Sequence, residues 1–351
     1  MRPIIQSGIF QVLTIMVGLV LMGAACSKNG DDALTPMPLK VPSNFPAATY
    51  ALDRNPITKE GFELGRKLFY DGLLSRDGTI SCGSCHIQGS AFTHHGHDVS
   101  HGIDDRLGVR NSPAIMNLAW NRFFFWDGGV FDLDLQPLGP IENPVEMDEH
   151  MPHVINKLKQ HKDYPALFNR VFGPGEINSD KLLKALSQFM LQCVSAESKY
   201  DKYIRNEGAQ LTTDELAGLT IFKQKCATCH STDLFTDNAF HNNGLTPTLF
   251  NDSGRFRVTL QPQDMHLFKT PSLRNVARTA PYMHDGRFLN LQAVLDHYSG
   301  GIQNSPTLDP LLKPNGLPGL PLSDTEKAQL IAFLQTLTDD AFLRNPILAE
   351  Q

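Results

Sequence analysis

The sequence predicts an all-α fold built from two similar halves with long loops. Every long periodic stretch in the 351 residues has the three-to-four-residue spacing of an amphipathic helix, and we find no convincing series of strands. One arrangement also occurs twice: a helical stretch, then a Cys-x-x-Cys-His motif, then a loop-rich stretch. Such a repeat indicates two domains related by duplication.

The repeated motif is the attachment signature of a c-type haem. Its cysteines form thioethers with the haem vinyl groups, and the next histidine becomes the proximal iron ligand. The two copies are Cys82, Cys85 and His86, and Cys226, Cys229 and His230. One four-thiolate zinc site or two redox disulfides are the alternatives. The copies lie 144 positions apart (Cys82 to Cys226), which is long for structural zinc, and neither alternative requires the histidines. We therefore expect two cytochrome-c-like domains, each carrying one covalently attached haem c.

Composition describes an ordinary globular protein. Hydrophobic residues make up 41% and charged residues 19%, and the length suits two domains. The formal net charge is −6, so nothing suggests a nucleic-acid partner.

The first residues predict export. Met1-Arg2 is followed by an apolar stretch over residues 9–25, typical of a secretory signal. Residues 22–27 resemble a lipobox with Cys26 as the lipidated first mature residue, although Gly23 stands where leucine is usual. A plain signal-peptidase cut or an uncleaved anchor therefore remain as alternatives. We expect a periplasmic protein, lipid-anchored to a membrane on the first interpretation.

The remaining boundaries follow from the helical patterns and the two motifs. The predicted order is a signal peptide (1–25), a flexible linker (26–46), an N-terminal cytochrome c domain (47–205), a C-terminal one (206–340) and a tail (341–351). Helices are predicted over 61–70, 180–203, 213–222 and 290–298, and a last one begins at Ser323 with a capping box. Residues 136–147 hold several prolines and predict a loop, and Cys193 is expected in a core.

Further motifs between and after the haem signatures carry a resemblance. They are Arg110-Asn111-Ser112-Pro113, Phe125-Trp126-Asp127-Gly128, Gln136, Gly139-Pro140 with Pro144 and Glu146-Met147, and a long motif over 273–286. With both haem signatures in order, the chain resembles the bacterial dihaem cytochrome c peroxidase family, which includes MauG-like enzymes. The resemblance covers about residues 47–339.

This resemblance implies a division of labour. The N-terminal haem would react with hydrogen peroxide, and the C-terminal haem would receive electrons from a small cytochrome c or cupredoxin. Trp126 matches the family tryptophan between the haems; without the motif it would be read as a core residue. Asn111 and the backbone carbonyls of Thr279 and Pro281 match a calcium site. A homodimer is compatible with the family.

Peroxide chemistry needs a group that moves a proton from the inner to the outer oxygen. The resemblance assigns this role to Glu146, with Gln136 as a hydrogen-bond partner in the pocket. Outside its motif, Glu146 would be read as a solvated surface group.

The distal iron ligands decide the subtype. Some family peroxidases cap the peroxide-reacting haem with a loop histidine, for which His101 is the first candidate. His94, His95 and His97 are alternatives, and all four could form an exposed polar loop. On the second haem, Tyr298 stands where typical peroxidases have methionine. A tyrosine at this position resembles the MauG-like subgroup, and a tyrosine ligand favours ferric iron.

Met283 and His297 are the fallback ligands of the second haem. Three functions remain open: a peroxidase, a MauG-like enzyme that uses peroxide to oxidise a protein or small molecule, and a non-enzymatic dihaem electron carrier.

Overall fold

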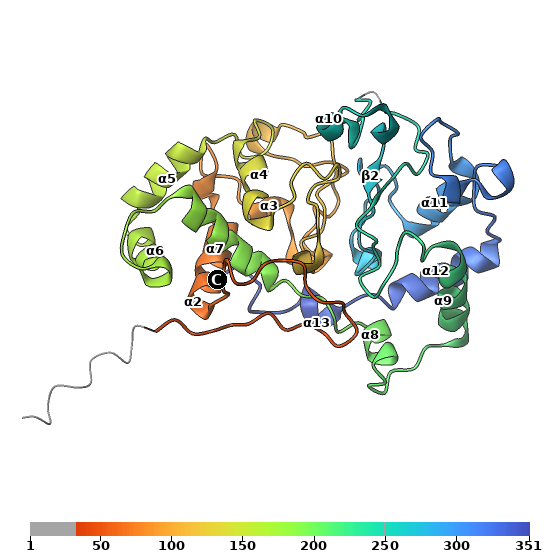
Figure 1. Ribbon diagram of the computed structural model, residues 1–351, viewed down its shortest axis with the longest axis horizontal. Coiled ribbons are helices and arrows are strands. Elements are labelled where there is room, and N and C mark those ends of the chain that lie inside the picture. The colour runs from red at the N-terminus through yellow and green to blue at the C-terminus, as the bar shows by residue number, and fades with distance from the viewer. Residues whose placement is uncertain (1–32, 249) are drawn as a thin grey trace, which may run out of the picture. The chain divides into compact units, whose positions relative to one another are not determined.

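Helices pair around two separate hydrophobic cores in the computed structural model, which describes residues 33–248 and 250–351 (Figure 1). The predicted all-α class is confirmed, because the described strands are two residues long each. The helices are α2 (Lys59–Tyr70), α3 (Cys82–Cys85), α4 (Leu138–Glu142), α5 (Met151–Gln160), α6 (Tyr164–Phe172), α7 (Ser179–Leu191), α8 (Lys199–Ile204), α9 (Thr213–Lys225), α10 (Phe256–Thr259), α11 (Leu291–Asp296), α12 (Asp324–Gln335) and α13 (Asp340–Leu343). Strands β1 (Phe240–His241) and β2 (Phe268–Lys269) pair antiparallel.

A glycine at a close helix crossing marks each half. In the first, α2 packs on α7, and a Cβ on Gly65 would lie 1.9 Å from the carbonyl oxygen of Ala185. In the second, α9 packs on α12, and a Cβ on Gly218 would lie 2.0 Å from the carbonyl oxygen of Gln329. Any side chain at either glycine would push the helices apart, because interiors leave no spare room.

The repeat extends to the loops that follow the motifs. Asn117 donates its backbone N–H to the carbonyl of Cys193 at 2.8 Å, just beyond α7. Asn275 donates to the carbonyl of Leu337 at 3.0 Å, just beyond α12. Both asparagines have a left-handed φ of 56° and precede a 3₁₀ turn. The two halves therefore share helix packing and loop conformation, as a duplication would produce.

The predicted helix over 180–203 is wrong in one respect, because it is two helices. α7 ends at Leu191 and α8 begins at Lys199, after the Ser198 cap. Between them, the Asp339 carboxylate accepts the backbone N–H groups of Ala196 and Glu197 at 2.8 and 2.9 Å. These bonds replace helical ones and redirect the chain toward the second core.

Two smaller predictions also need correction. The proline-rich loop over 136–147 contains the short helix α4. The helix expected over 290–298 ends at Asp296 and continues as a π turn over His297–Gly301. The capping box of Ser323 and Glu326 before α12 is confirmed, and Cys193 is fully buried in the first core.

Segments near both ends of residues 36–351 pack against the first core. Phe45, in the stretch predicted as a linker, is 8% exposed, and Trp120 donates its Nε1–H to the carbonyl of Pro46 at 2.8 Å. From the other end, Phe342 and Leu348 are buried in the same core. Residues 36–46 and 340–348 are thus packed segments. The predicted signal peptide and Cys26 lie outside the described residues.

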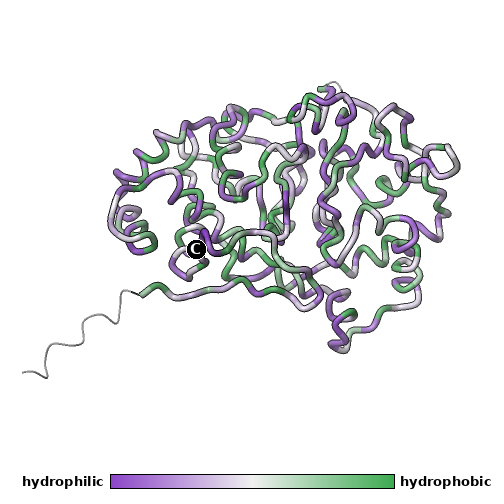
Figure 2. The backbone as a smooth tube through the Cα atoms, viewed as in Figure 1, coloured by the Kyte–Doolittle hydropathy of each residue, from purple (hydrophilic) through white to green (hydrophobic). Residues whose placement is uncertain are grey.

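Hydrophobic and hydrophilic residues alternate over short distances along the backbone (Figure 2). Among the described residues, no helix has the length and apolar character needed to cross a membrane.

Candidate functional site

Each motif histidine is oriented by a backbone carbonyl. Nδ1 of His86 lies 2.7 Å from the carbonyl oxygen of Phe92, and Nδ1 of His230 lies 3.1 Å from that of Phe235. Because a carbonyl oxygen only accepts, each Nδ1 carries the proton and donates it. Burial lowers the pKa of both histidines, so the rings are neutral. Each Nε2 is thus left as the free coordinating nitrogen, which is the usual arrangement of a metal-bound histidine.

Aromatic packing holds these carbonyls in place. Phe92 contacts the ring of Phe69 on α2 (ring centroids 5.9 Å apart), and Phe235 contacts Phe222 on α9 (5.6 Å). Phe92 and Phe235 both have a positive φ, 58° and 55°, which turns the backbone so that the carbonyl faces the histidine. The same backbone arrangement therefore orients the histidine of both motifs.

The four motif cysteines do not form the alternative sites. None is in a disulfide. Cys82 packs against the first core and Cys226 against the second, so the two pairs do not meet in one four-thiolate site. Burial raises the pKa of Cys82 and of Cys226 to about 12, so both thiols are protonated. Unbridged thiols beside a histidine with a free Nε2 fit a covalently attached haem.

A cavity of about 260 Å³ opens beside the second motif, and we call it the second cavity. Cys226, Cys229 and His230 line it, and most of its remaining wall is apolar. The apolar residues include Phe222, Leu273, Val276, Leu291, Leu295, Leu330 and Leu334. An apolar cavity with two thiols and an oriented imidazole suits a haem group.

Tyr298 lines the same cavity as His230. Burial raises the pKa of its phenol to about 12, while a hydrogen bond from Asn243 lowers it. The Asn243 amide also donates to the sulfur of Met283 at 3.4 Å, and Met283 lines the cavity too. His297 uses Nε2 to bond the carbonyl of Asn243 at 2.9 Å, which leaves it poorly placed to bind iron. Tyr298 and Met283 thus remain as candidate ligands.

The loop after the first motif lies against the segment that carries Glu146. A Cβ on Gly102 would lie 2.4 Å from the carbonyl oxygens of both Val145 and Glu146, so only glycine permits this approach. The adjacent carbonyl of His101 accepts the Cys85 thiol at 3.4 Å. The first motif, His101 and Glu146 are therefore neighbours.

Burial raises the pKa of Glu146, although its Oε1 accepts the Asn143 amide at 2.8 Å. The negative charge of Glu146 contributes to raising the pKa of the Cys82 and Cys85 thiols. Gln136 is half-buried at the turn before α4, and its side chain forms no hydrogen bond with any described residue. A carboxyl with a raised pKa beside the first motif is suited to carry a proton.

The histidine-rich loop is not uniformly exposed. His95 and His97 are exposed, whereas His94 is 7% exposed and stacks on His97 with ring centroids 4.1 Å apart. Burial, followed by the charges of His97 and His86, lowers the pKa of His94 to about 4. The His101 ring lies 3.4 Å from the Asp105 carboxylate and is about one-third exposed.

Trp126 lines the second cavity and links both halves of the chain. Its Nε1–H donates to the carbonyl of Asn111 at 2.8 Å, and its own carbonyl accepts the backbone N–H of Lys269 at 2.7 Å. Asn111 in turn donates its N–H to the carbonyl of His284 at 2.7 Å. The indole of Trp126 is therefore held by Asn111, and its backbone is held by Lys269.

The three expected calcium ligands, Asn111, Thr279 and Pro281, line this cavity as well. The Asn111 amide donates to the carbonyl of Asp98 at 3.1 Å, which fixes its orientation. Within the described chain, its Oδ1 and the carbonyl oxygens of Thr279 and Pro281 accept no hydrogen bond. Hard, unpaired oxygens of this kind suit calcium.

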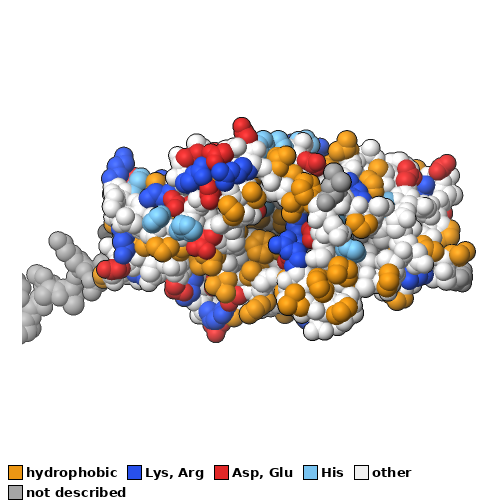
Figure 3. Space-filling view, turned by 90° about the horizontal axis from the view of Figure 1, so that it is seen from above, with side chains coloured by type: hydrophobic (Ala, Val, Ile, Leu, Met, Phe, Trp, Pro, Cys, Tyr) orange, Lys and Arg blue, Asp and Glu red, His pale blue; other side chains and the backbone are white. Residues whose placement is uncertain are grey.

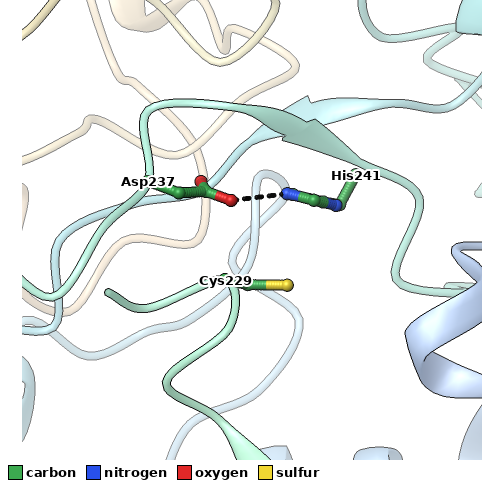
Figure 4. A group of neighbouring side chains, drawn as sticks. All are labelled: Cys229, Asp237 and His241. Atoms are coloured by element: carbon green, nitrogen blue, oxygen red, sulfur yellow. Dashed lines mark hydrogen bonds and ion pairs between the residues drawn. The ribbon is translucent and has the colours of Figure 1, made fainter. Parts of the chain in front are cut away.

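A charged group that the sequence did not indicate lies beside Cys229 (Figure 4). Nε2 of His241 bonds Asp237 at 2.9 Å, and its Nδ1 bonds Asp309 at 2.5 Å. Hydrogen bonds that His241 donates to the Cys229 sulfur and to the carboxylates of Asp309 and Asp237 raise the pKa of His241 to about 10. A metal could use Cys229, Asp237 and His241 only where Cys229 carries no thioether.

Sequence reasoning also missed the carbonyls of Phe92 and Phe235. Aligning the two motifs could have found them, because Phe92 follows His86 by six residues and Phe235 follows His230 by five. It assigned no role to Asn243 or Lys269, although both side chains line the second cavity.

Residues 59–209 match the family described as di-haem cytochrome c peroxidase. The methylamine utilization protein MauG of Methylorubrum extorquens is 37% identical over 81% of this chain and 79% of its own length. The cytochrome c551 peroxidase of Nitrosomonas europaea is 33% identical over 79% of this chain and 80% of its own.

Solved structures agree in fold. A MauG-like protein associated with microbial copper homeostasis has a TM-score of 0.80 and 34% identity, covering 89% of this chain and 99% of its own. A Y463M variant of the diheme peroxidase BthA from Burkholderia thailandensis has a TM-score of 0.75 and 23% identity, covering 89% and 93%.

Proposed function

Because the chain belongs to the di-haem cytochrome c peroxidase family, we propose that it is an exported peroxidase that reduces hydrogen peroxide to water. The observation that carries the proposal is the repeated histidine arrangement: both motifs present a neutral imidazole with Nδ1 bonded to a carbonyl and Nε2 free. Electrons would pass from a donor through the C-terminal haem to the N-terminal one.

The residues that would hold the two haems are the motif cysteines and histidines, in domains over 47–205 and 206–340. They are Cys82, Cys85 and His86 in the first, and Cys226, Cys229 and His230 in the second. Haem iron supplies an open coordination position for peroxide and a store of electrons.

Glu146 would move the proton. Its carboxylate accepts the proton of the inner peroxide oxygen and returns it to the outer one, so that water can leave as the O–O bond breaks. Two further protons and two electrons then convert the remaining oxygen atom to the second water. Asn143 holds the Glu146 carboxyl in position through its bond to Oε1, and Gln136 offers an unpaired amide to the substrate.

Trp126 would relay electrons between the two sites, since it lines the second cavity and its indole is held by the carbonyl of Asn111. A calcium ion on Asn111, Thr279 and Pro281 would hold the same segments together. Removing the calcium ion should loosen the hydrogen bond between the Trp126 indole and the carbonyl of Asn111.

We propose a small cytochrome c or cupredoxin as donor, as the family suggests. Figure 3 shows a face on which hydrophobic side chains surround a hollow with basic groups at its edge. Exposed apolar residues in the described part of the chain include Phe131, Phe250 and Leu260. A periplasmic location, a lipid anchor on Cys26 and a homodimer complete the proposal.

A second candidate function is a MauG-like reaction, in which peroxide is used to oxidise a protein or small molecule. Tyr298 in the second cavity favours it, because a phenolate ligand stabilises ferric iron and lowers the potential. That would make simple electron acceptance from a small cytochrome less favourable.

The test is one titration of the haem-loaded protein, followed by electron paramagnetic resonance and visible spectra. If half-reduction converts a six-coordinate N-terminal haem to a five-coordinate one, and oxidation of reduced cytochrome c by peroxide appears only then, the peroxidase proposal holds. If the diferric protein already has a high-spin haem that reacts with peroxide, the MauG-like function replaces it. If neither form reacts, the chain is an electron carrier.

A further inference from the structure

The backbone of Lys269 is held by two other segments of the chain. It lies in β2, opposite Phe240 of β1, and its N–H donates to the carbonyl of Trp126 at 2.7 Å. The next residue, Thr270, is fixed in the same way by Ala239 at 2.9 Å. The start of the Lys269 side chain is therefore set by the strand pair and by Trp126.

The ammonium group of Lys269 has no protein partner. It forms no hydrogen bond or ion pair with any residue in 33–248 or 250–351, although the side chain lines the second cavity. Lys225, the other lysine on the cavity wall, is by contrast satisfied: its Nζ bonds the Pro321 carbonyl at 2.6 Å and Glu326 at 2.9 Å. The two lysines therefore differ in whether the protein alone neutralises them.

An unpaired ammonium in an apolar cavity is unfavourable, because the charged form loses water without gaining a partner. Burial accordingly lowers the pKa of Lys269 to about 8, with a small opposing effect of Asp237. Asp237 forms no ion pair with Lys269: its Oδ2 bonds His241 at 2.9 Å, and its Oδ1 accepts the backbone N–H of Ala239 at 2.8 Å. The missing counter-charge must come from whatever fills the cavity.

We propose that Lys269 binds a carboxylate of the haem attached at Cys226 and Cys229. This rests on the proposed haem attachment, and the chemistry is specific: a haem carries two propionate carboxylates, and an ammonium is a compact partner for either. The bond would place a positive charge between the second haem and Trp126. Such a charge favours the reduced iron, so Lys269 raises the potential of the second haem.

The experiment compares K269M with K223M in the haem-loaded full chain. Methionine keeps the length and apolar stem of lysine and removes the charge. Lys223 is exposed on α9, three residues before Cys226, so K223M removes the same charge near the same motif. Redox titration followed at each haem should show a lower potential at the second haem in K269M, with the first haem and K223M unchanged. An unchanged second haem in K269M would overturn the proposal.

K269R and resonance Raman spectra protect the test against a folding defect. K269R keeps the charge, so it should retain the wild-type potential; an equal fall in K269R and K269M would show that packing, not charge, is responsible. The propionate bending band of the second haem should shift in K269M, and an unshifted band contradicts the contact. These readouts are independent of peroxide turnover, so a protein that shifts its potential without turnover refutes the proposed function and leaves the haem contact standing.

Discussion

His86 donates from Nδ1 to the backbone carbonyl of Phe92 at 2.7 Å, an interaction that fixes both the tautomer and the rotation of the ring. His230 repeats it with Phe235 at 3.1 Å. A core histidine could use either nitrogen, whereas a ligand needs a defined free one. The repetition of this bond in both halves is why two haems are expected rather than one.

The first prediction concerns haem content. The double variant C82A/C85A should lose one covalent haem and keep the other, and C226A/C229A should do the same for the second site. Mass spectrometry of the intact chain and the pyridine haemochrome assay measure this directly. The single-site loss is expected because the two pairs pack against different cores. Loss of both haems in either variant would show that the sites do not form independently.

The second prediction concerns Glu146. E146Q keeps the shape of the side chain but cannot accept a proton, so peroxide turnover should fall by about 10²–10⁴-fold, the usual contribution of a general acid–base group. Steady-state kinetics with peroxide at saturating donor measure it. E142Q is the matched control: Glu142 lies in the same segment and is exposed, and the glutamine still accepts the Met151 N–H. Equal losses in the two variants would exclude the assigned role.

The pH profile gives a second readout of the same group. Burial raises the pKa of Glu146, so the carboxylate becomes protonated at a higher pH than an exposed glutamate would. Turnover that needs the carboxylate should therefore decline on the acid side at an unusually high pH. The decline should disappear in E146Q; a profile that E146Q leaves intact must belong to another group.

Local sequence signals predicted the helices and the motifs but not how distant segments meet. The capping box at Ser323 and the spacing of 213–222 are local, so both helices were found. The break between α7 and α8 was not, because it depends on Asp339, well over 100 residues away along the chain. A single sequence holds no direct record of such a contact.

In the candidate site, too, local motifs could be predicted from the sequence and distant contacts could not. His86 and His230 were found from their motifs, whereas the partnerless Lys269 was not, since an unpaired lysine is recognisable only when its surroundings are known. The packing of Phe45 against the first core was missed because the stretch around it has the composition of a linker. Composition reports average behaviour, and one buried aromatic residue overrides it.

The third prediction concerns Tyr298. Replacing a phenolate ligand by a thioether should raise the potential of the second haem, so Y298M should show a higher midpoint and a methionine-type visible spectrum. Y282F is the control, because Tyr282 lines the same cavity but its hydroxyl bonds the carbonyl of Val276 at 2.8 Å. A wild-type spectrum in Y298M would instead favour Met283, which M283L would then test.

The fourth prediction concerns the buried ion pair of Asp201 and Arg274, both fully buried, with N–O distances of 2.7 and 2.8 Å. D201A leaves the guanidinium of Arg274 buried without its carboxylate partner, so the free energy of unfolding should fall by about 3–5 kcal/mol. Urea denaturation measures this change. D340A, which breaks the exposed pair with Arg344, should change the free energy of unfolding by only about 0–1 kcal/mol.

Lowering the pH should narrow the difference in unfolding free energy between D201A and the wild type. Burial alone would raise the pKa of Asp201, but hydrogen bonds and charge from Arg274, with help from Ser198 and Asn44, hold it below its ordinary value. A carboxyl whose folded pKa is lowered stabilises fully above its unfolded pKa and loses that contribution as pH falls through the folded one. The two urea midpoints should therefore converge as the pH falls below the ordinary carboxyl range. Midpoints that stay apart there would mean that D201A acts through lost packing, and not through the charge that Arg274 needs.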